Sequence, residues 1–181
     1  YLRPGFAFGG SCLPKDLRAL THRGRQLDLD LPLLSNVLPS NDQHLRAATE
    51  AVMATAPRSV ALLGLTFKTG TDDVRESPFV RLAETLIGKG IDVRIWDPDL
   101  QPERLVGRNL SFVEDRLPHL ARLLRDTPEE AMTGTDVVAV GSSHVDALPA
   151  LEAWPGRLVD LSGAARELER STAGTYEGVA W

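Results

Sequence analysis

The stretch "SVALLGL", residues 59–65, decides the fold class of this chain. It is a short apolar run that ends in glycine, and its side chains do not alternate between apolar and polar types. Strands buried on both faces of a parallel sheet have this pattern, whereas a half-exposed strand alternates. We therefore expect residues 59–65 to form a strand inside a parallel sheet.

Further apolar runs repeat this pattern towards the C-terminus. They are "DVRIWDP" (92–98), "TDVVAVGS" (135–142) and "RLVDLSG" (157–163). Helices are predicted between them at 77–90, 118–126 and 127–132, and the first has an N-cap candidate in Ser77, Pro78 at its first position and a closing Gly88 or Gly90. Alternating strands and helices predict an α/β domain at 58–181, a Rossmann-like, mostly parallel sheet with helices on both faces.

Residues 1–57 are predicted to form a helical N-terminal segment. After a glycine-rich start, a helix is expected from about Pro14, with Leu17, Leu20 and Leu27 on one face. A longer helix is predicted at 33–56, where apolar residues recur at helical spacing. Pro39 interrupts that pattern and predicts a kink or a break.

Composition excludes several classes of function. The chain has 181 residues, a net charge of -5 and one cysteine, so we expect neither nucleic-acid binding nor an intrachain disulfide, and a reducing cytoplasm as its location. No apolar run approaches the roughly 20 residues that span a bilayer, so no membrane partner is expected. The opening "YLRPGFAFGG" is neither an initiator methionine nor a signal peptide, so we expect a piece of a longer protein.

The only cysteine, Cys12, lies in "FGGSCLPKD", residues 8–16. A cysteine at a helix start meets free N–H groups and the positive end of the helix dipole, which favour the nucleophilic thiolate. Asp16, one helical turn later, could deprotonate a water molecule, and Lys15 adds a cation. The alternative, a small buried apolar cysteine, stays open at this point.

A second candidate site is "GLTFKTGTDDVRESP", residues 64–78, between the first strand and its helix. Open α/β sheets bind ligands at this edge, and Lys68 and Arg75 suit a phosphate. The loop lacks G-x-G-x-x-G, so a standard NAD site is not predicted here; a solvated charged loop is the alternative. Asp97 is interpreted as a turn residue. The four scattered histidines (22, 44, 119 and 144) are interpreted as surface residues, and no metal site is predicted.

Together, "PGFAFGGSCLPKD" and "LGLTFKTGTDDVRESP" resemble the two signatures of the UDP-glucose/GDP-mannose dehydrogenase family. "LAETLIGKG" and the terminal "EGVAW" are similar to the branch that oxidises GDP-mannose. The resemblance implies an enzyme of polysaccharide biosynthesis that oxidises a nucleotide sugar twice at C6 with NAD, from alcohol to acid. Oxidation of UDP-glucose or a UDP-amino sugar is the alternative substrate choice.

The resemblance also implies roles for individual residues. Cys12 would attack the aldehyde to form a thiohemiacetal and then a thioester, which water held by Asp16 would hydrolyse. The other implied contacts are Lys15 and Arg75 with NAD, Phe8, Gly9, Phe67 and Lys68 with the nucleotide sugar, and Tyr1 and Arg3 near the substrate. The helix at 33–56 would form a homodimer.

The family's N-terminal NAD-binding domain is not among these residues, so we expect a C-terminal part that is inactive alone. Two other classes stay open. One is a non-catalytic nucleotide-sugar-binding or dimerisation module, and the other is a thiol hydrolase with a histidine near Cys12.

Overall fold

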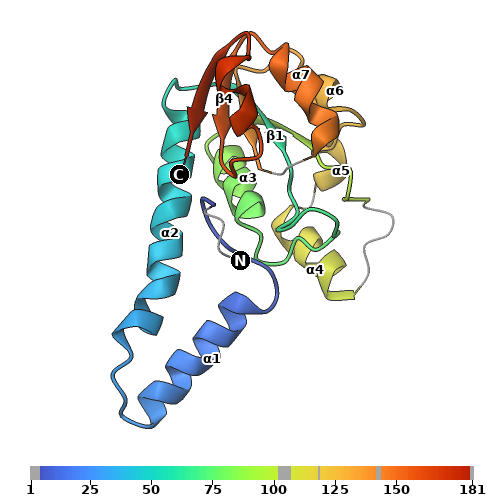
Figure 1. The fold of residues 1–181 in the computed structure, drawn as a ribbon. Helices are drawn as coiled ribbons and strands as arrows, with labels where there is room; N and C mark the ends of the chain where they lie inside the picture. Colours follow the sequence, from blue (N-terminus) through green and yellow to red (C-terminus); the bar gives the residue numbers. More distant parts are fainter. Residues whose placement is uncertain (1–4, 102–106, 118, 142–143, 180–181) are drawn as a thin grey trace.

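A parallel sheet forms the centre of the molecule (Figure 1). The computed structural model describes residues 5–101, 107–117, 119–141 and 144–179. The strands are β1 (Ser59–Leu63), β2 (Asp92–Trp96), β3 (Val137–Val140), β4 (Arg157–Asp160) and β5 (Thr175–Gly178). Their order is β2-β1-β3-β4-β5, and every neighbouring pair is parallel. The order reverses between β1 and β3, and ligands of such sheets bind at the carboxyl ends of the strands beside this reversal.

The predicted strands are confirmed, and their burial explains why they could be predicted. All four residues of β3 are buried, as are residues 60–63 of β1. The side chains of one strand alternate between two clusters on opposite faces, since Leu62 belongs to one and Leu63 to the other. Strand β5 was not predicted, because it lies at the edge and its side chains are mostly exposed.

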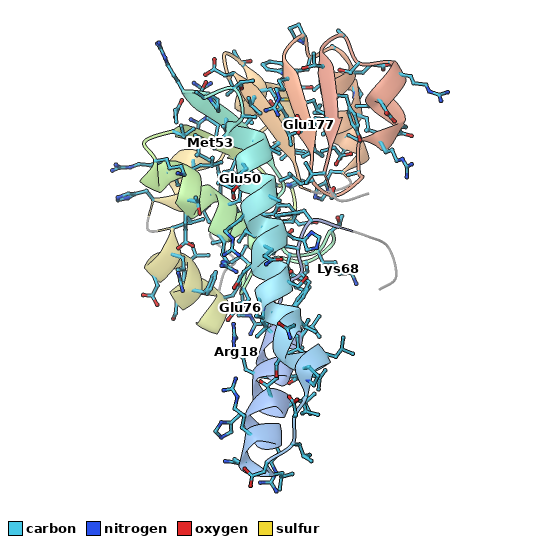
Figure 2. All side chains as sticks on the ribbon, turned by 90° about the vertical axis from the view of Figure 1, so that its left-hand side faces the viewer. Arg18, Glu50, Met53, Lys68, Glu76 and Glu177 are labelled. Carbon is cyan, nitrogen blue, oxygen red and sulfur yellow. The ribbon has the colours of Figure 1, made fainter. Side chains whose placement is uncertain are left out.

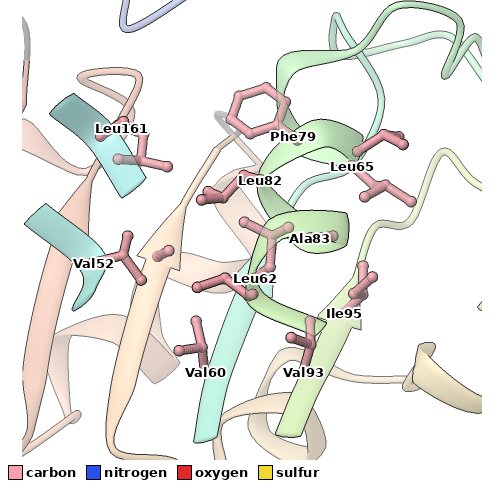
Figure 3. Close-up of a cluster of buried hydrophobic side chains, with 14 of the residues drawn as sticks. Val52, Val60, Leu62, Leu65, Phe79, Leu82, Ala83, Val93, Ile95 and Leu161 are labelled. Carbon is pink, nitrogen blue, oxygen red and sulfur yellow. The ribbon is translucent and has the colours of Figure 1, made fainter. Parts of the chain in front are cut away.

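Helices cover both faces of the sheet, as predicted. They are α1 (Leu13–Gln26), α2 (Pro32–Met53), α3 (Pro78–Gly88), α4 (Gly107–Arg116), α5 (Leu120–Leu123), α6 (Pro128–Met132) and α7 (Leu148–Glu152), with 3₁₀ turns at Val145–Ala147 and Arg166–Arg170. Side chains of α2, α3, α4 and α5 share one buried cluster with the sheet, and those of α6, α7 and the second 3₁₀ turn share the other. Figure 3 shows the first cluster, in which Leu82 and Ala83 of α3 face Leu62 of β1.

The start of α3 has the predicted capping chemistry. The Ser77 hydroxyl accepts a hydrogen bond from the Phe79 N–H (3.2 Å), and Pro78 opens the helix. The helix predicted at 118–126 is wrong in extent, because α5 is a single turn. Helices α4 and α7 were not predicted.

Helices α1 and α2 form a hairpin that projects from the sheet (Figure 1). A break at Pro39 is not present, because α2 runs through this residue without interruption. A kink there stays a prediction. Leu17 is buried, but Leu20 and Leu27 are more than half exposed, so the part of the chain that the structure describes does not cover the predicted apolar face of α1.

The C-terminal half of α2 packs into the sheet cluster through Leu45, Ala48 and Val52. Arg157 of β4 holds the last turn of this helix, since its guanidinium donates to the Ala51 carbonyl (2.7 Å) and pairs with Glu177 of β5. A guanidinium at a helix C-terminus satisfies carbonyls that the helix leaves free. Within the described residues, no helix is long and apolar enough to cross a membrane.

Candidate functional site

The loop that carries Cys12 and the loop after β1 are in direct contact. The Gly10 N–H donates to the Arg75 carbonyl (3.1 Å). A Cβ at Gly9 would lie 2.1 Å from the Glu76 carbonyl oxygen, and one at Gly10 would lie 2.9 Å from the Phe67 ring. Only glycine allows so close an approach, so the pair Gly9-Gly10 holds the two predicted loops together.

The loop after β1 reaches this contact through an unusual backbone turn. Glu76 has a positive φ of 53°, which is uncommon for a side chain of this kind. The Ser77 hydroxyl that follows donates to the Leu65 carbonyl (2.7 Å) and ties the end of the loop to its start. The Glu76 carboxylate pairs with both terminal nitrogens of Arg18 on α1 (3.0 and 3.1 Å), as Figure 2 shows. The turn therefore connects the sheet to the first helix.

Asn41 of α2 fixes the other side of the Cys12 loop. Its side-chain oxygen accepts from the Phe8 N–H (2.8 Å), and its side-chain nitrogen donates to the Phe8 carbonyl (2.9 Å). Both backbone groups of Phe8 are thereby satisfied by one side chain. No sequence motif predicts this role, because Asn41 and Phe8 are 33 residues apart.

Cys12 is the N-cap residue of α1, and its side chain is an exposed free thiol. Its carbonyl accepts the Asp16 N–H (2.9 Å), and its sulfur lies 3.8 Å from the Ser11 hydroxyl. The predicted helix start is confirmed, and the alternative of a buried apolar cysteine is wrong.

Cys12 opens into a pocket of about 960 Å³ between the loop and α2. The predicted site residues that line it are Phe8, Gly9, Cys12 and Phe67. Its other walls include Leu13, Leu33 and Val37, so much of the surface is apolar.

Four predicted site residues are not among the walls of this pocket: Lys15, Asp16, Lys68 and Arg75. The Lys15 ammonium lies 3.4 Å from the Asp16 carboxylate, and both side chains are largely exposed. Lys68 is also exposed. The predicted residues Tyr1 and Arg3 lie outside the described residues.

Arg75 is held by Asp73 within the same loop. Its Nε and one terminal nitrogen donate to the two carboxylate oxygens at 2.8 and 2.7 Å. Burial alone would raise the pKa of Asp73, but the hydrogen bonds from Arg75 outweigh it, so this pKa lies below its ordinary value. The pKa of Arg75 is raised, mainly by its hydrogen bond with Asp73, and the charge of a Cys12 thiolate adds to this effect.

Asp97 is the buried anchor of the start of this loop. One carboxylate oxygen accepts from the Leu65 N–H (2.7 Å), the Thr66 N–H (2.9 Å) and the Thr66 hydroxyl (3.0 Å). The other oxygen accepts from the Asp99 N–H (3.0 Å), which confirms the predicted turn. The sequence did not reveal the contacts with Leu65 and Thr66, which join residues more than 30 positions apart.

Asn109 of α4 holds the later part of the same loop. Its oxygen accepts from the Val74 N–H (3.1 Å), and its nitrogen donates to the Asp72 carbonyl (2.7 Å). It therefore resembles Asn41 in using one amide to satisfy two backbone groups.

His44 of α2 also lines the pocket that contains Cys12. A thiol hydrolase needs a hydrogen bond between the nucleophile and its base. Among the described residues, the hydrogen-bond partner of the Cys12 sulfur is Ser11, and none is a histidine. The described geometry does not support a thiol hydrolase.

These features define a doubly wound α/β protein that presents an exposed thiol at the ligand-binding edge of its sheet. Two family models match the chain. The UDP-glucose/GDP-mannose dehydrogenase family, UDP binding domain, covers residues 61–153, and the central domain of the same family covers residues 1–43. The chain belongs to the UDP-glucose/GDP-mannose dehydrogenase family.

Curated relatives agree with this assignment. The chain is 43% identical to a GDP-mannose 6-dehydrogenase of Pseudomonas aeruginosa and 46% identical to one of Pseudomonas putida, in both cases over its whole length. A UDP-glucose 6-dehydrogenase of Rickettsia felis is 30% identical over 81% of the chain. The chain spans about two fifths of the length of the Pseudomonas relatives, at 41% and 42%.

Solved structures give the same result. A ternary complex of GDP-mannose dehydrogenase from Pseudomonas aeruginosa has a TM-score of 0.87 and covers 100% of this chain, which in turn covers 41% of that protein. A UDP-glucose dehydrogenase from Pyrobaculum islandicum has 31% identity and a TM-score of 0.76, with 98% of this chain and 39% of that protein covered.

Proposed function

We propose that this chain carries the thiol and the nucleotide-sugar domain of a GDP-mannose 6-dehydrogenase. The whole protein would oxidise GDP-mannose to GDP-mannuronate by removing four electrons. The observation that carries this proposal is the contact between the two loops, in which Gly10 is bonded to Arg75 and packed against Phe67. This contact places Cys12 beside the loop at the ligand-binding edge of the sheet.

Cys12 would act after the first oxidation has produced an aldehyde at C6. Its sulfur would add to the carbonyl carbon, and the oxygen would take a proton, which gives a thiohemiacetal. Loss of the C6 hydrogen as a hydride, together with the hydroxyl proton, would leave a thioester. Attack by water would then release the carboxylate and restore the thiol. Asp16 is proposed as the group that holds this water, after its side chain has left Lys15.

NAD⁺, when bound, would accept one hydride in each of the two oxidations. The described residues do not form a dinucleotide cradle, because the loop after β1 has Gly64 and Gly70 but no closely spaced glycine set. Lys15 and Arg75 are proposed as contacts that reach a dinucleotide held mainly elsewhere in the whole protein. We accordingly expect no NADH formation by the 181-residue chain alone.

The choice of GDP-mannose is supported by the relatives. GDP-mannose 6-dehydrogenases of several Pseudomonas species and of Azotobacter vinelandii are 39–46% identical over the whole chain, whereas UDP-glucose 6-dehydrogenases of two Rickettsia species are 30–31% identical over about four fifths of it. We propose Phe8, Gly9, Phe67 and Lys68 as the nucleotide-sugar contacts on this chain, with Tyr1 and Arg3 near the substrate. A UDP-sugar is the second candidate.

We further propose a domain boundary at residues 57/58 and a homodimer formed through α2. The dimer is supported by large apolar side chains that the hairpin leaves exposed. They are Leu13, Leu20, Leu27, Leu29 and Leu33, with exposed fractions between 48% and 79%. Leu33 lies on α2, and the other four lie on α1 or in the loop that joins it to α2. A cytoplasmic location is proposed from the single free cysteine.

Calorimetric titration of the chain with GDP-mannose and UDP-glucose tests the substrate proposal. We expect GDP-mannose to bind more tightly, and we expect Phe67→Ala to weaken that binding by about tenfold, because a stacked aromatic contact contributes roughly 1–3 kcal/mol. Phe112→Ala, a change outside this pocket, is the matched control. Tighter binding of UDP-glucose would assign the chain to the other branch, and binding of neither would favour a non-catalytic dimerisation module.

A further inference from the structure

We propose that Asp97, Asp99 and His144 form a binding site for a divalent cation of the zinc class. The three residues come together at the carboxyl edge of the sheet, after β2 and after β3. One ligand atom from each residue lies within 4.8 Å of the others. This inference does not depend on the proposed oxidation.

His144 gives the strongest indication that this site binds a ligand. Its side chain is only 9% exposed, and its Nε2 atom has no hydrogen-bond partner within the described part of the chain. A buried polar nitrogen is nearly always satisfied in a folded protein. The Trp96 ring packs edge-on against the imidazole, at 5.6 Å between centroids, and limits its rotation. The unpartnered nitrogen is therefore held in place towards the two carboxylates.

The distances leave room for an ion between these groups. Nε2 of His144 lies 3.8 Å from Oδ1 of Asp97 and 3.6 Å from Oδ2 of Asp99. Both distances are too long for a hydrogen bond. In a tetrahedral zinc site with bonds of about 2.0–2.2 Å, neighbouring ligand atoms are about 3.4 Å apart. The two distances from Nε2 are therefore within about half an ångström of the spacing in a tetrahedral zinc site.

Hydrogen bonds already orient both carboxylates for binding a cation. Oδ1 of Asp97 accepts one N–H, from Asp99, and Oδ2 of Asp99 accepts one N–H, from Gly70 (2.5 Å). A carboxylate oxygen has two lone pairs, so each oxygen keeps one for a cation. Hydrogen bonds that fix the ligands from outside are typical of metal sites.

The donor set favours zinc over magnesium or calcium. Imidazole nitrogen is a good ligand for zinc and its neighbours in the first transition series, whereas magnesium and calcium prefer oxygen. Octahedral magnesium also requires ligand atoms about 3.0 Å apart, closer than those found here.

An ion at this site would hold the loop after β1 in its observed position. Asp97 binds the start of the loop at Leu65 and Thr66, and Asp99 binds it at Gly70. Phe67 and Lys68 lie between these anchors. The ion would therefore join the ends of β2 and β3 to the residues that face the Cys12 loop.

The test is a titration of the chelator-stripped chain with Zn²⁺, followed by calorimetry and by thermal unfolding. We expect one ion per chain, a higher melting temperature, and slower hydrogen exchange in the loop from 64 to 76. Both His144→Ala and Asp99→Asn should weaken binding at least tenfold, since even indirect contacts at metal sites contribute 10- to 100-fold. His119→Ala, a change at an exposed histidine, should leave it unchanged.

Two results would overturn the proposal. One is the absence of zinc binding to the chelator-stripped chain. The other is zinc binding that survives both substitutions and so occurs elsewhere on the chain. If His144→Ala does not fold, Asp99→Asn decides the question together with the visible spectrum of the Co²⁺ form, which should show tetrahedral coordination.

Discussion

The sheet buries its apolar side chains, whereas the α1–α2 hairpin leaves several of its apolar side chains exposed to solvent. In β1 and β3 every apolar side chain is at most 1% exposed, and two helical layers cover them. In the hairpin, Leu20 is 54% exposed and Leu33 is 79% exposed. Helices of this chain bury both faces of the sheet. The hairpin leaves an exposed apolar surface of the kind that packs against another protein.

The site lies where these two regions meet. The hairpin supplies Cys12 and Asn41, and the sheet supplies Phe67 and Asp97. A rigid sheet can hold a ligand in a fixed position, while the exposed hairpin can respond to a partner. The difference between the regions can therefore be tested by substitutions on each side of their junction.

The largest effect is expected in the core. Leu62→Ala should lower the free energy of unfolding by about 2–5 kcal/mol, because it removes a fully buried side chain from the centre of the sheet. Leu20→Ala, the matched change on the hairpin, should alter it by less than about 0.5 kcal/mol. Urea unfolding measures both. Equal losses would contradict the view that only the sheet is completed within the chain.

A smaller loss of folding stability is expected when the contact between the two loops is disturbed. Gly9→Ala would place a methyl group 2.1 Å from the Glu76 carbonyl oxygen, so the loops must separate, at a cost of about 1–3 kcal/mol. The same change at Gly5, where no atom lies within 4 Å, is the control. Urea unfolding gives the cost, and hydrogen exchange at Gly10 should become faster only in the Gly9 variant. Similar results for both variants would argue against interlocked loops.

Asn41→Ala should cost about 1–2 kcal/mol, because it leaves two backbone groups of Phe8 without their partner. The exchange of the Phe8 amide proton should accelerate, which NMR can follow. Gln43→Ala, at an exposed position of the same helix, should change neither the stability nor the exchange of the Phe8 amide proton. An unchanged exchange rate in the Asn41 variant would show that the loop is held by other contacts.

The pair Asp73–Arg75 predicts a pH effect. The folded pKa of Asp73 lies below its unfolded value, so its ionised form stabilises the fold. This contribution is complete above the unfolded pKa of about 3.9 and is lost as the pH falls through the lower folded pKa. Arg75→Gln should therefore reduce stability at about pH 6 and make little difference in strong acid. An equal effect at both pH values would contradict the assignment.

The smallest effect is expected for the exposed pair of Arg18 and Glu76, which joins α1 to the loop after β1. Glu76→Gln should lower stability by less than about 1 kcal/mol, because solvent and salt screen exposed ion pairs. Urea unfolding at low and high salt measures it, and the difference from the parent chain should shrink as salt is added. A larger, salt-independent loss would contradict the view that the pair is exposed and screened by solvent.

The sequence predicted the parts that local patterns encode. Buried strands are continuous apolar runs, so β1 to β4 were found, and Ser77 with Pro78 marked the start of α3. Edge strand β5 carries no such run, because one side of it faces solvent. The exposure of Leu20 and Leu27 could not be predicted, because helical spacing does not show whether anything covers the face.

The site was also predicted only in part, because local sequence patterns do not show contacts between residues far apart in the chain. Cys12 and the loop after β1 stand out in contiguous motifs, and the structure brings Phe8, Gly9, Cys12 and Phe67 to one pocket. The residues that position these loops, Asn41, Asn109 and Asp97, act over distances of more than 30 positions in the sequence. His144 was interpreted as a surface residue, because its neighbours Asp97 and Asp99 are far away along the chain.

The most direct test of the account is the rate at which iodoacetamide alkylates Cys12, with and without nucleotide sugar. Mass spectrometry reports on this one thiol alone, because the chain has a single cysteine. The account predicts that saturating GDP-mannose slows the alkylation strongly and that UDP-glucose at the same concentration slows it less. An alkylation rate that GDP-mannose leaves unchanged would contradict the claim that the Cys12 loop and the loop after β1 form one nucleotide-sugar site.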